Sequence, residues 1–453
     1  MAETNIAPEM QLSPEQEQAL RDFNLGKNIF LTGPGGTGKT ALIRRMVAAC
    51  KADGRRVQVC ALTGCAAILL NCQAKTVHSW AGIGLANGPA DIIVKRLIDN
   101  KYKIKNWQKI DVLIIDEVSM MSQKIFEILD SIGRSVLKRK AHLPFGGIQV
   151  IFSGDFYQLP PVNTGNSLDE TEGAFCFESP RWIETFPPAQ VIQLRKIFRQ
   201  TDDTYTKILN QIRTGRLTKS SFDCLLSHVA KPLPTNFVPT ILFPRRKDVD
   251  GINAIEFAKL SAPEKKYKLD RIDPLLLVPA LAWSAESLYE LNADQREMEY
   301  NYLTASIMAE KELILKKGTQ VMCIANIDTE SPEPVVNGSQ GIVIDFVGEL
   351  PLVQFNNGSR RTVGYHHWIS EKQATVGVKQ IPLIYAWAIT IHKAQGVSLE
   401  LAQIDAGNNI FECGQTYVAL SRVKSLNGLY LTAFNPQKIK VNRKVQEFYS
   451  TLA

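Results

Sequence analysis

The sequence predicts an α/β protein with two parallel-sheet domains and an insertion in each of them. Short apolar, strand-like runs alternate with helix-like segments over the first 190 residues and again near the C-terminus. This alternation is typical of parallel sheets with crossover helices. Between about 251 and 380 the alternation fails, and short strands separated by glycine turns follow one another. That pattern is typical of a small antiparallel β-barrel.

Length and composition agree with this organisation. The chain has 453 residues, enough for two or more domains, and its 45% hydrophobic and 21% charged residues are ordinary for a globular protein. The net charge of +7 suits an anionic partner without requiring one. The eight cysteines show no metal-ligand spacing, so we interpret them as reduced thiols of an intracellular protein. No apolar run reaches bilayer-spanning length, and the N-terminus resembles neither a signal nor a transit peptide.

Each element of the first domain has its own sequence signal. Ser13 and Pro14 predict the N-terminus of the first helix. The apolar spacing of 122–140 predicts a helix with one buried face. Glycines and lysines at 83–106 indicate a small insertion, and Pro187-Pro188 marks the boundary between domains 1–190 and 191–453. The remaining strands are expected at 28–32, 57–62, 112–115 and 148–153, and the remaining helices at 41–47 and 66–71.

The second domain is expected to contain an insertion within its own α/β alternation. Its parallel-sheet strands are expected near 232–244, 383–391 and 428–434, on both sides of the β-rich block. Within that block, consecutive antiparallel strands are expected at 319–325, 341–347 and 350–355.

A glycine-rich loop separates the first strand from the following helix. Its sequence is Gly33-Pro34-Gly35-Gly36-Thr37-Gly38-Lys39-Thr40. Backbone N–H groups of such a loop curve around a polyphosphate, and the helix N-terminus adds partial positive charge. Lys39 is expected to reach the β- and γ-phosphates and Thr40 to ligate Mg²⁺. The loop therefore predicts a site for a nucleoside triphosphate with Mg²⁺.

Acidic and amide side chains accompany this loop. Asp116 is expected to hold the Mg²⁺ shell, and Glu117 to polarise the attacking water. Gln158, in the segment 154–161, is expected to sense the γ-phosphate, because strand ends at one edge of a parallel sheet converge. The Gln16 amide could pair with an adenine edge, and the alternative is a solvated helix residue.

Two arginines in the predicted second domain, 191–453, are candidates for transition-state stabilisation. Loss of a γ-phosphate spreads negative charge, which arginines stabilise when a facing domain delivers them. Arg199 and Arg422 fit this role, with a surface or salt-bridge position as the alternative for each.

Taken together, the motifs resemble those of superfamily 1 DNA helicases, and specifically of the Pif (petite integration frequency) family, which is related to RecD. The stretches 154–161 and 390–396 are the most discriminating, and 126–134, with Asp130 and Arg134, is similar to the family's own signature. The matching segments, in family order, are Gln16, 33–40, 63–67, 76–79, 116–119, 145–147, 154–161, 198–200, 337–338, 390–396 and 418–422.

The resemblance implies two RecA-like domains. It also implies a wedge at about 82–107, and an accessory insertion at about 251–380 with an SH3-like β-barrel at about 318–380. Gln16 would read adenine, Gln158 would sense the γ-phosphate, and Arg199 and Arg422 would be arginine fingers, while Gly396 is assigned to the nucleotide. The residues expected to face single-stranded DNA are Thr63, Gly64, His78, Asn337, Thr390 and His392.

The implied function is that of an ATP-dependent 5′→3′ DNA helicase using ATP and Mg²⁺. It would translocate on single-stranded DNA and unwind tailed or forked duplexes, with G-quadruplex and RNA–DNA hybrid as further substrates. A monomeric motor is expected, with dimerisation on DNA left open. It would be intracellular, in the nucleus or mitochondria for a eukaryotic or viral protein and in the cytoplasm for a bacterial or phage protein. The implied pathways are replication, recombination, repair and telomere maintenance. Two alternatives remain: a RecD-like motor subunit of a recombination or nuclease complex, and an ATP-gated DNA-remodelling module without strand separation.

Overall fold

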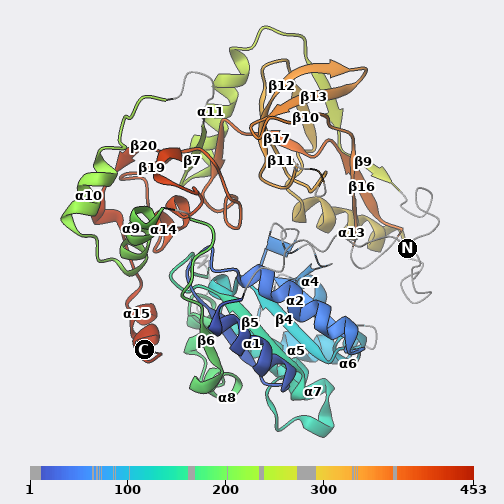
Figure 1. Cartoon of the computed structure of the whole chain (residues 1–453). Coiled ribbons are helices and arrows are strands. Elements are labelled where there is room, and N and C mark those ends of the chain that lie inside the picture. Colours follow the sequence, from blue (N-terminus) through green and yellow to red (C-terminus); the bar gives the residue numbers. More distant parts are fainter. Residues whose placement is uncertain are drawn as a thin grey trace, which may run out of the picture. The chain divides into compact units, whose positions relative to one another are not determined.

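The computed structural model divides the chain into two compact units (Figure 1). The first contains Met1–Leu62, Leu70–Thr206 and Val441–Ala453, and the second contains Thr63–Leu69 and Lys207–Lys440. The structure describes residues 12–63, 66, 67, 70, 72, 74–84, 86, 88–100, 103–161, 169–200, 202–233, 239–272, 292–328, 331, 333, 335–370 and 375–452. In this part of the chain, no helix is both long and apolar enough to cross a membrane.

A six-stranded parallel sheet forms the centre of the first unit. Its spatial order is β3-β2-β4-β5-β1-β6. Every residue of β1, β4 and β5 is buried, as expected for parallel strands covered on both faces. The strands are β1 (Ile29–Thr32), β2 (Val57–Ala61), β3 (Lys75–Thr76), β4 (Val112–Asp116), β5 (Gln149–Gly154) and β6 (Val191–Gln193).

Helices surround this sheet and confirm most of the predicted segments. They are α1 (Pro14–Asn24), α2 (Lys39–Ala52), α4 (Val77–Ala81), α5 (Ala90–Ile98), α6 (Ile104–Gln108), α7 (Gln123–Val136), α8 (Trp182–Thr185) and α15 (Arg443–Ser450). Ser13 caps α1 as predicted. The predicted insertion at 83–106 forms α5 and α6, which both contact α7. The helix expected at 66–71 falls partly outside the described residues.

The first unit extends further along the chain than the sequence predicted. The predicted boundary follows residue 190, but β6 pairs with β1, with Val191 opposite Phe30. The unit continues to Thr206 and also includes the C-terminal segment Val441–Ala453. A strand of three residues after a proline pair gives little sequence signal, although it completes the sheet. In α15, Val445 and Tyr449 join the hydrophobic core of this unit.

The second unit contains a four-stranded parallel sheet, in the order β18-β7-β19-β20. The α/β alternation predicted on both sides of an insertion is therefore confirmed. Its strands are β7 (Thr240–Phe243), β18 (Ala388–Thr390), β19 (Ala402–Ala406) and β20 (Leu429–Phe434). The helices of the unit are α9 (Asp203–Thr214), α10 (Lys219–Leu226), α11 (Arg246–Ala258), α13 (Ala293–Ser306) and α14 (Gln415–Leu420).

The inserted block is antiparallel, as predicted. Its main sheet has the order β14-β13-β12-β11-β17, formed by β11 (Gln320–Cys323), β12 (Gln340–Val347), β13 (Leu350–Phe355), β14 (Arg360–Thr362) and β17 (Leu383–Tyr385). Two smaller sheets pair β10 (Glu312–Leu315) with β8 (Lys265–Lys268), and β16 (Gly377–Gln380) with β9 (Asp270–Ile272) and β15 (His366–Ile369). Closure of these strands into an SH3-like barrel stays a prediction.

The edges of this insertion differ from the prediction at both ends. The stretch 383–391, expected as one strand of the parallel sheet, divides into β17 and β18 in two different sheets. Only two residues separate these strands. The sequence therefore shows one continuous apolar run and gives no sign that the chain changes sheet. At the other end, α11 packs on β18 and β7 and so belongs to the α/β part, although its residues from 251 onwards fall in the predicted insertion at 251–380.

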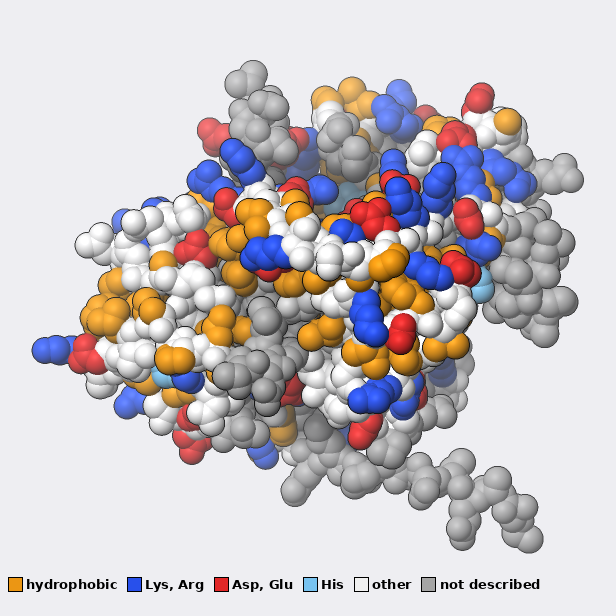
Figure 2. Space-filling model, turned by 90° about the horizontal axis from the view of Figure 1, so that it is seen from above, with side chains coloured by type: hydrophobic (Ala, Val, Ile, Leu, Met, Phe, Trp, Pro, Cys, Tyr) orange, Lys and Arg blue, Asp and Glu red, His pale blue; other side chains and the backbone are white. Residues whose placement is uncertain are grey.

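Positive and negative side chains are mixed on one face of the molecule. On the face shown in Figure 2, Lys and Arg side chains lie among Asp and Glu side chains. Surface ion pairs in the second unit include Lys265 with Glu349 at 2.8 Å. Such mixing weakens any long-range field, so the charge alone does not indicate where an anionic partner binds.

Candidate active site

The glycine-rich loop connects β1 to α2, and neighbouring residues enclose it closely. A Cβ on Gly36 would lie 2.5 Å from the Arg199 Cβ, and a Cβ on Gly38 would lie 2.8 Å from Gln16 Nε2. Both glycines have positive φ, 86° and 82°. Only glycine fits this backbone path, which is the kind of path that turns consecutive N–H groups towards an anion. The loop therefore fits a polyphosphate.

Side chains of the glycine-rich loop form hydrogen bonds with its own backbone. The Lys39 ammonium donates hydrogen bonds to the carbonyl oxygens of Gly33 (2.7 Å) and Pro34 (2.9 Å). The Thr37 hydroxyl donates to Pro34 as well, at 2.9 Å. Lys39 and Thr40 are the first two residues of α2 and are half-buried. The predicted lysine and hydroxyl thus lie together at a helix N-terminus, which favours bound phosphate.

An acidic pair ends β4, the second strand from the loop in the sheet. Asp116 is only 6% exposed, and burial raises the pKa of its carboxyl to about 6, with the negative charge of Glu117 adding to the rise. Glu117 has a φ of 56°, a strained backbone region that recurs at active sites. A carboxylate and the Thr40 hydroxyl are the oxygen ligands that Mg²⁺ accepts. This donor set fits the predicted metal, which would offset the cost of burying the charge.

The loop after β5 carries Gln158. β5 is the direct neighbour of β1, with Gly154 opposite Thr32. Gln158 is 4% exposed, and its Oε1 has no hydrogen-bond partner among the described residues. Its backbone N–H donates to the Asp155 carbonyl at 2.8 Å, which forms a tight turn. A buried amide oxygen without a donor is rare and is consistent with a ligand-sensing role.

Gln16 is a buried residue, so the alternative of a solvated helix residue is wrong. It is 1% exposed. Its Oε1 accepts from the Ser13 N–H at 3.0 Å, and its Nε2 donates to the Thr37 carbonyl at 3.2 Å. The side chain therefore ties the start of α1 to the glycine-rich loop. An adenine contact by Gln16 stays a prediction.

Arg199 belongs to the first unit, which corrects the expectation that a facing domain delivers it. After β6, the chain follows the loop: the Leu194 N–H donates to the Thr32 carbonyl and the Phe198 N–H donates to the Gly36 carbonyl, both at 2.8 Å. Arg199 therefore lies directly against Gly36. The sequence analysis missed Gln200, which is 7% exposed beside the same glycine.

Arg422 lies just after α14 in the second unit. It is 2% exposed, its Nε donates to the Val418 carbonyl at 2.9 Å, and its Nη2 donates to the Ser421 hydroxyl at 2.8 Å. These contacts fix a buried guanidinium in one orientation, so the surface alternative is wrong. Its role as an arginine finger stays a prediction.

Residues predicted to face DNA or nucleotide in the second unit line two pockets. Asn337 and Gly396 share one pocket of about 390 Å³, together with Lys424. Thr390 lines another of about 350 Å³. His392 is exposed in the turn after β18.

The remaining residues predicted to contact DNA lie early in the chain. Thr63 accepts a hydrogen bond from the Ala66 N–H at 3.2 Å. His78 lies in α4, where burial lowers the pKa of its imidazole ring. Gly64 lies outside the described residues.

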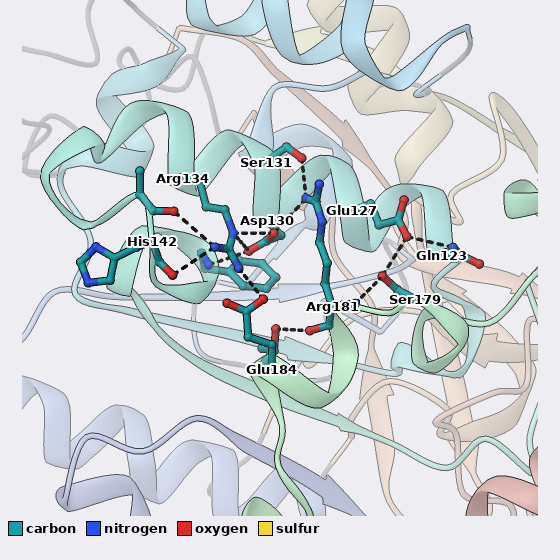
Figure 3. Close-up of polar contacts among 12 residues, drawn as sticks. Gln123, Glu127, Asp130, Ser131, Arg134, His142, Ser179, Arg181 and Glu184 are labelled. Carbon is teal, nitrogen blue, oxygen red and sulfur yellow. Dashed lines mark hydrogen bonds and ion pairs between the residues drawn. The ribbon is translucent and has the colours of Figure 1, made fainter.

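The signature stretch in α7 forms a buried charge cluster (Figure 3). Asp130 is fully buried and accepts hydrogen bonds from Arg134 Nε (2.8 Å), Arg181 Nη1 (2.9 Å) and the Phe145 N–H (2.8 Å). Arg134 also donates to the carbonyl of His142, at 3.3 Å. A buried carboxylate is stable only when it is paired in this way. The cluster fixes the turn before β5, and so has a structural role that lies apart from the glycine-rich loop.

Sequence comparisons agree with this site. Residues 11–222 match the PIF1-like helicase family, and residues 300–346 match the 2B domain of DNA helicase Pif1. The chain is 34% identical over 448 residues to ATP-dependent DNA helicase PIF1 of Danio rerio, covering 98% of this chain and 64% of that protein. It is 35% identical to ATP-dependent DNA helicase Pif1 of Bdellovibrio bacteriovorus, covering 97% of this chain and 92% of that protein. The chain thus spans less than two thirds of the length of the Danio rerio protein and most of the Bdellovibrio bacteriovorus protein.

Solved structures give the same result over the whole chain. The crystal structure of Pif1 helicase from Candida albicans has a TM-score of 0.76 and 33% identity, and covers 98% of this chain and 100% of that one. Bacteroides sp Pif1 in complex with ADP-AlF4 has a TM-score of 0.76 and 26% identity, with 98% and 97% covered. Fold, motif order and near-complete coverage of the Bdellovibrio relative together show that this chain belongs to the PIF1-like helicase family.

Proposed function

We propose that this protein is an ATP-dependent DNA helicase that moves 5′→3′ on single-stranded DNA and unwinds duplex DNA. The observation that carries the proposal concerns one edge of the parallel sheet in the first unit. Three strands end at this edge, and Lys39, Asp116 and Gln158 lie at or after their ends. The relatives are named ATP-dependent DNA helicases, and solved relatives include a Bacteroides Pif1 bound to single-stranded DNA.

The chain's own groups divide the work of hydrolysis. Bound ATP with Mg²⁺ supplies the phosphoanhydride bond whose cleavage drives movement. Lys39 neutralises the β- and γ-phosphates, while Thr40 and Asp116 hold the metal. Glu117 orients the attacking water and Gln158 responds to the γ-phosphate.

The two arginines contribute in different ways. Arg199 stabilises developing charge from its place beside the glycine-rich loop in the same unit. Arg422 contributes a guanidinium that two hydrogen bonds already orient. Both roles are proposals, supported by the closeness of Arg199 to Gly36 and by the burial of Arg422.

The proposed path for single-stranded DNA uses hydroxyl, amide and imidazole groups. Thr63, His78, Asn337, Thr390 and His392 suit phosphate contacts and base stacking. Separating one base pair costs only about 1.4 kcal/mol, which ATP hydrolysis readily supplies. The helical insertion with α5 and α6 is the proposed wedge.

We propose an intracellular monomer that acts on tailed or forked DNA. It would work in the nucleus or mitochondria if it is eukaryotic or viral, and in the cytoplasm if it is bacterial or from a phage. A solved relative is described as two coordinating Pif1 helicases at forked double-stranded DNA, which makes a second copy on DNA a specific expectation. Roles in replication, recombination, repair and telomere maintenance belong to the same proposal.

The test is ATP-dependent strand displacement on matched duplexes that carry either a 5′ or a 3′ tail. We expect displacement of the 5′-tailed duplex only, and none by the Lys39→Ala variant. Displacement from the 3′ tail would contradict the polarity. DNA-stimulated hydrolysis without displacement would favour the remodelling module, and weak unwinding restored by a co-purifying complex would favour the RecD-like subunit.

A further inference from the structure

One phenol hydroxyl near the C-terminus contacts two loops of the site. Tyr449, in α15, places its Oη 2.5 Å from the Oγ1 of Thr32, the residue just before the glycine-rich loop. The same oxygen accepts a hydrogen bond from the Phe156 N–H at 3.2 Å and donates one to the Asp155 carboxylate at 3.4 Å. Asp155 and Phe156 begin the turn that carries Gln158. A single atom therefore joins the two loops.

The protons of this group allow one consistent arrangement. The Thr32 hydroxyl and the Phe156 N–H both donate to Tyr449, whose own hydroxyl proton goes to Asp155. Thr32 and Asp155 are fully buried, so water does not replace a lost partner readily. Removing this oxygen would take a hydrogen bond from the Phe156 N–H and from the buried Thr32 hydroxyl, which is costly.

Contacts other than the hydroxyl hold α15 in place. The Tyr449 ring stacks on Tyr157, with centroids 4.7 Å apart and planes at 15°. Phe448 stacks on Phe177 at 4.4 Å. Lys444 forms an ion pair with Glu178. A change that removes only the hydroxyl should therefore leave the helix docked.

We propose that Tyr449 is a positioning residue for nucleotide hydrolysis. Its hydroxyl fixes the Gln158 turn against the end of β1, and thereby orients the Gln158 amide relative to the glycine-rich loop. This inference rests on the proposed function, because it needs a phosphate between these loops. An error of about 1 Å in the position of a catalytic group can cost about 10²-fold in rate, so a small displacement is sufficient.

The direct test is the Tyr449→Phe variant of the full chain. We expect kcat for DNA-stimulated ATP hydrolysis to fall about tenfold, with KM for ATP within about twofold of the original, since binding precedes the step that Gln158 serves. The matched control is Tyr267→Phe, which removes a hydroxyl that donates to the Glu349 carbonyl at 2.8 Å in the second unit. This control should retain kcat. An unchanged kcat in Tyr449→Phe would overturn the inference.

A second measurement separates positioning from general stability. In a Gln158→Ala background, Tyr449→Phe should cause no further loss of kcat, because both changes remove the same orientation. A tenfold additional loss would mean that Tyr449 acts independently of Gln158, and would overturn the inference.

Hydrogen exchange tests the contact without any enzyme activity. Exchange at the Phe156 N–H should rise at least tenfold in Tyr449→Phe and stay unchanged in Tyr267→Phe. Unchanged exchange at Phe156 would overturn the inference even if the proposed function stands. A chain that lacks ATP hydrolysis but shows the expected exchange would instead contradict the proposed function.

Discussion

Each unit contains a parallel sheet whose strand ends carry polar residues, but the two sets differ in burial. In the first unit, Asp116, Asp155 and Gln158 are at most 6% exposed. In the second unit, Thr390 is half-buried and His392 is exposed. Fixed, water-poor groups suit chemistry on a small ligand, whereas exposed groups suit contacts along an extended one. The burial of these residues therefore agrees with the two tasks proposed for them.

Burial in the first unit carries a measurable cost. Asp116 has a raised pKa because its carboxylate is buried next to Glu117, and Glu117 has a strained backbone. Such features persist only where the surrounding structure holds them in place. We therefore expect changes at the first site to have large effects, and changes at the exposed edge of the second unit to have smaller ones.

The largest effect is expected for Lys39→Ala. Removing the ammonium that now bridges Gly33 and Pro34 should lower kcat for ATP hydrolysis on the order of 10²–10³-fold or more, because no other group takes its place at the phosphates. The thermal midpoint should change by only a few degrees, since the side chain is half-buried. Steady-state hydrolysis with single-stranded DNA measures this. Normal turnover would refute the assigned site.

Gly36→Ala should weaken nucleotide binding by about 10²-fold. The new Cβ would lie 2.5 Å from the Arg199 Cβ, and the backbone at this position has a φ of 86°. The steric clash and the backbone strain would each cost about 1–3 kcal/mol. Gly54→Ala is the matched control, since its φ is also positive, 68°, but nothing lies within 4 Å of the added atom. Fluorescent-nucleotide titration should show loss in Gly36→Ala only. Equal losses would mean that backbone strain, and not the enclosed loop, determines affinity.

Sequence reasoning succeeded where one strong local signal determines the structure. The loop 33–40, the acids after β4 and the Gln158 turn all follow buried strands, and the topology brings these strands together. The antiparallel insertion was predictable for the same reason, because its strands alternate over short glycine turns.

Contacts between segments distant in sequence could not be predicted. The sequence assigned Arg199 to a facing domain, because the pairing of the three-residue β6 with β1 has no local signature. Tyr449 received no role, since its contacts with Thr32 and Phe156 join residues about 290 or more positions apart. The signals for α15 were an N-cap asparagine, Asn442, and the amphipathic spacing of Val445 and Tyr449.

Asp116→Asn should stabilise the metal-free protein while it abolishes hydrolysis. The folded carboxyl has a pKa of about 6, whereas an unfolded aspartate titrates near 4, so the folded state binds its proton more tightly. Above pH 7 both states are ionised and the folded chain bears the cost of the buried charge. As the pH falls through 6, the folded state is protonated first and its stability rises. The variant, which lacks this charge, should therefore gain about 1–3 kcal/mol at pH 8.

The measurement is thermal unfolding of the full chain in the presence of a metal chelator, at pH 8 and at pH 4.5. The advantage of Asp116→Asn should shrink at the lower pH, because the original side chain is then neutral in the folded state. A variant that is less stable at pH 8 would show that local hydrogen bonds to the carboxylate outweigh its burial. In that case, burial of the Asp116 charge would not destabilise the first unit, contrary to the inference above.

The smallest effect is expected at the exposed edge of the second unit. His392→Ala should weaken single-stranded DNA binding by about 1–2 kcal/mol, the cost of losing one stacking ring. Nucleotide affinity should change by less than twofold, because the exposed ring lies outside the glycine-rich loop. His142→Ala is the control, an exposed histidine of the first unit outside the motifs predicted to contact DNA. Fluorescence anisotropy with a labelled oligonucleotide compares the two. If His142→Ala weakened DNA binding as much as His392→Ala, exposure alone would explain the loss, and the second sheet edge would have no special role.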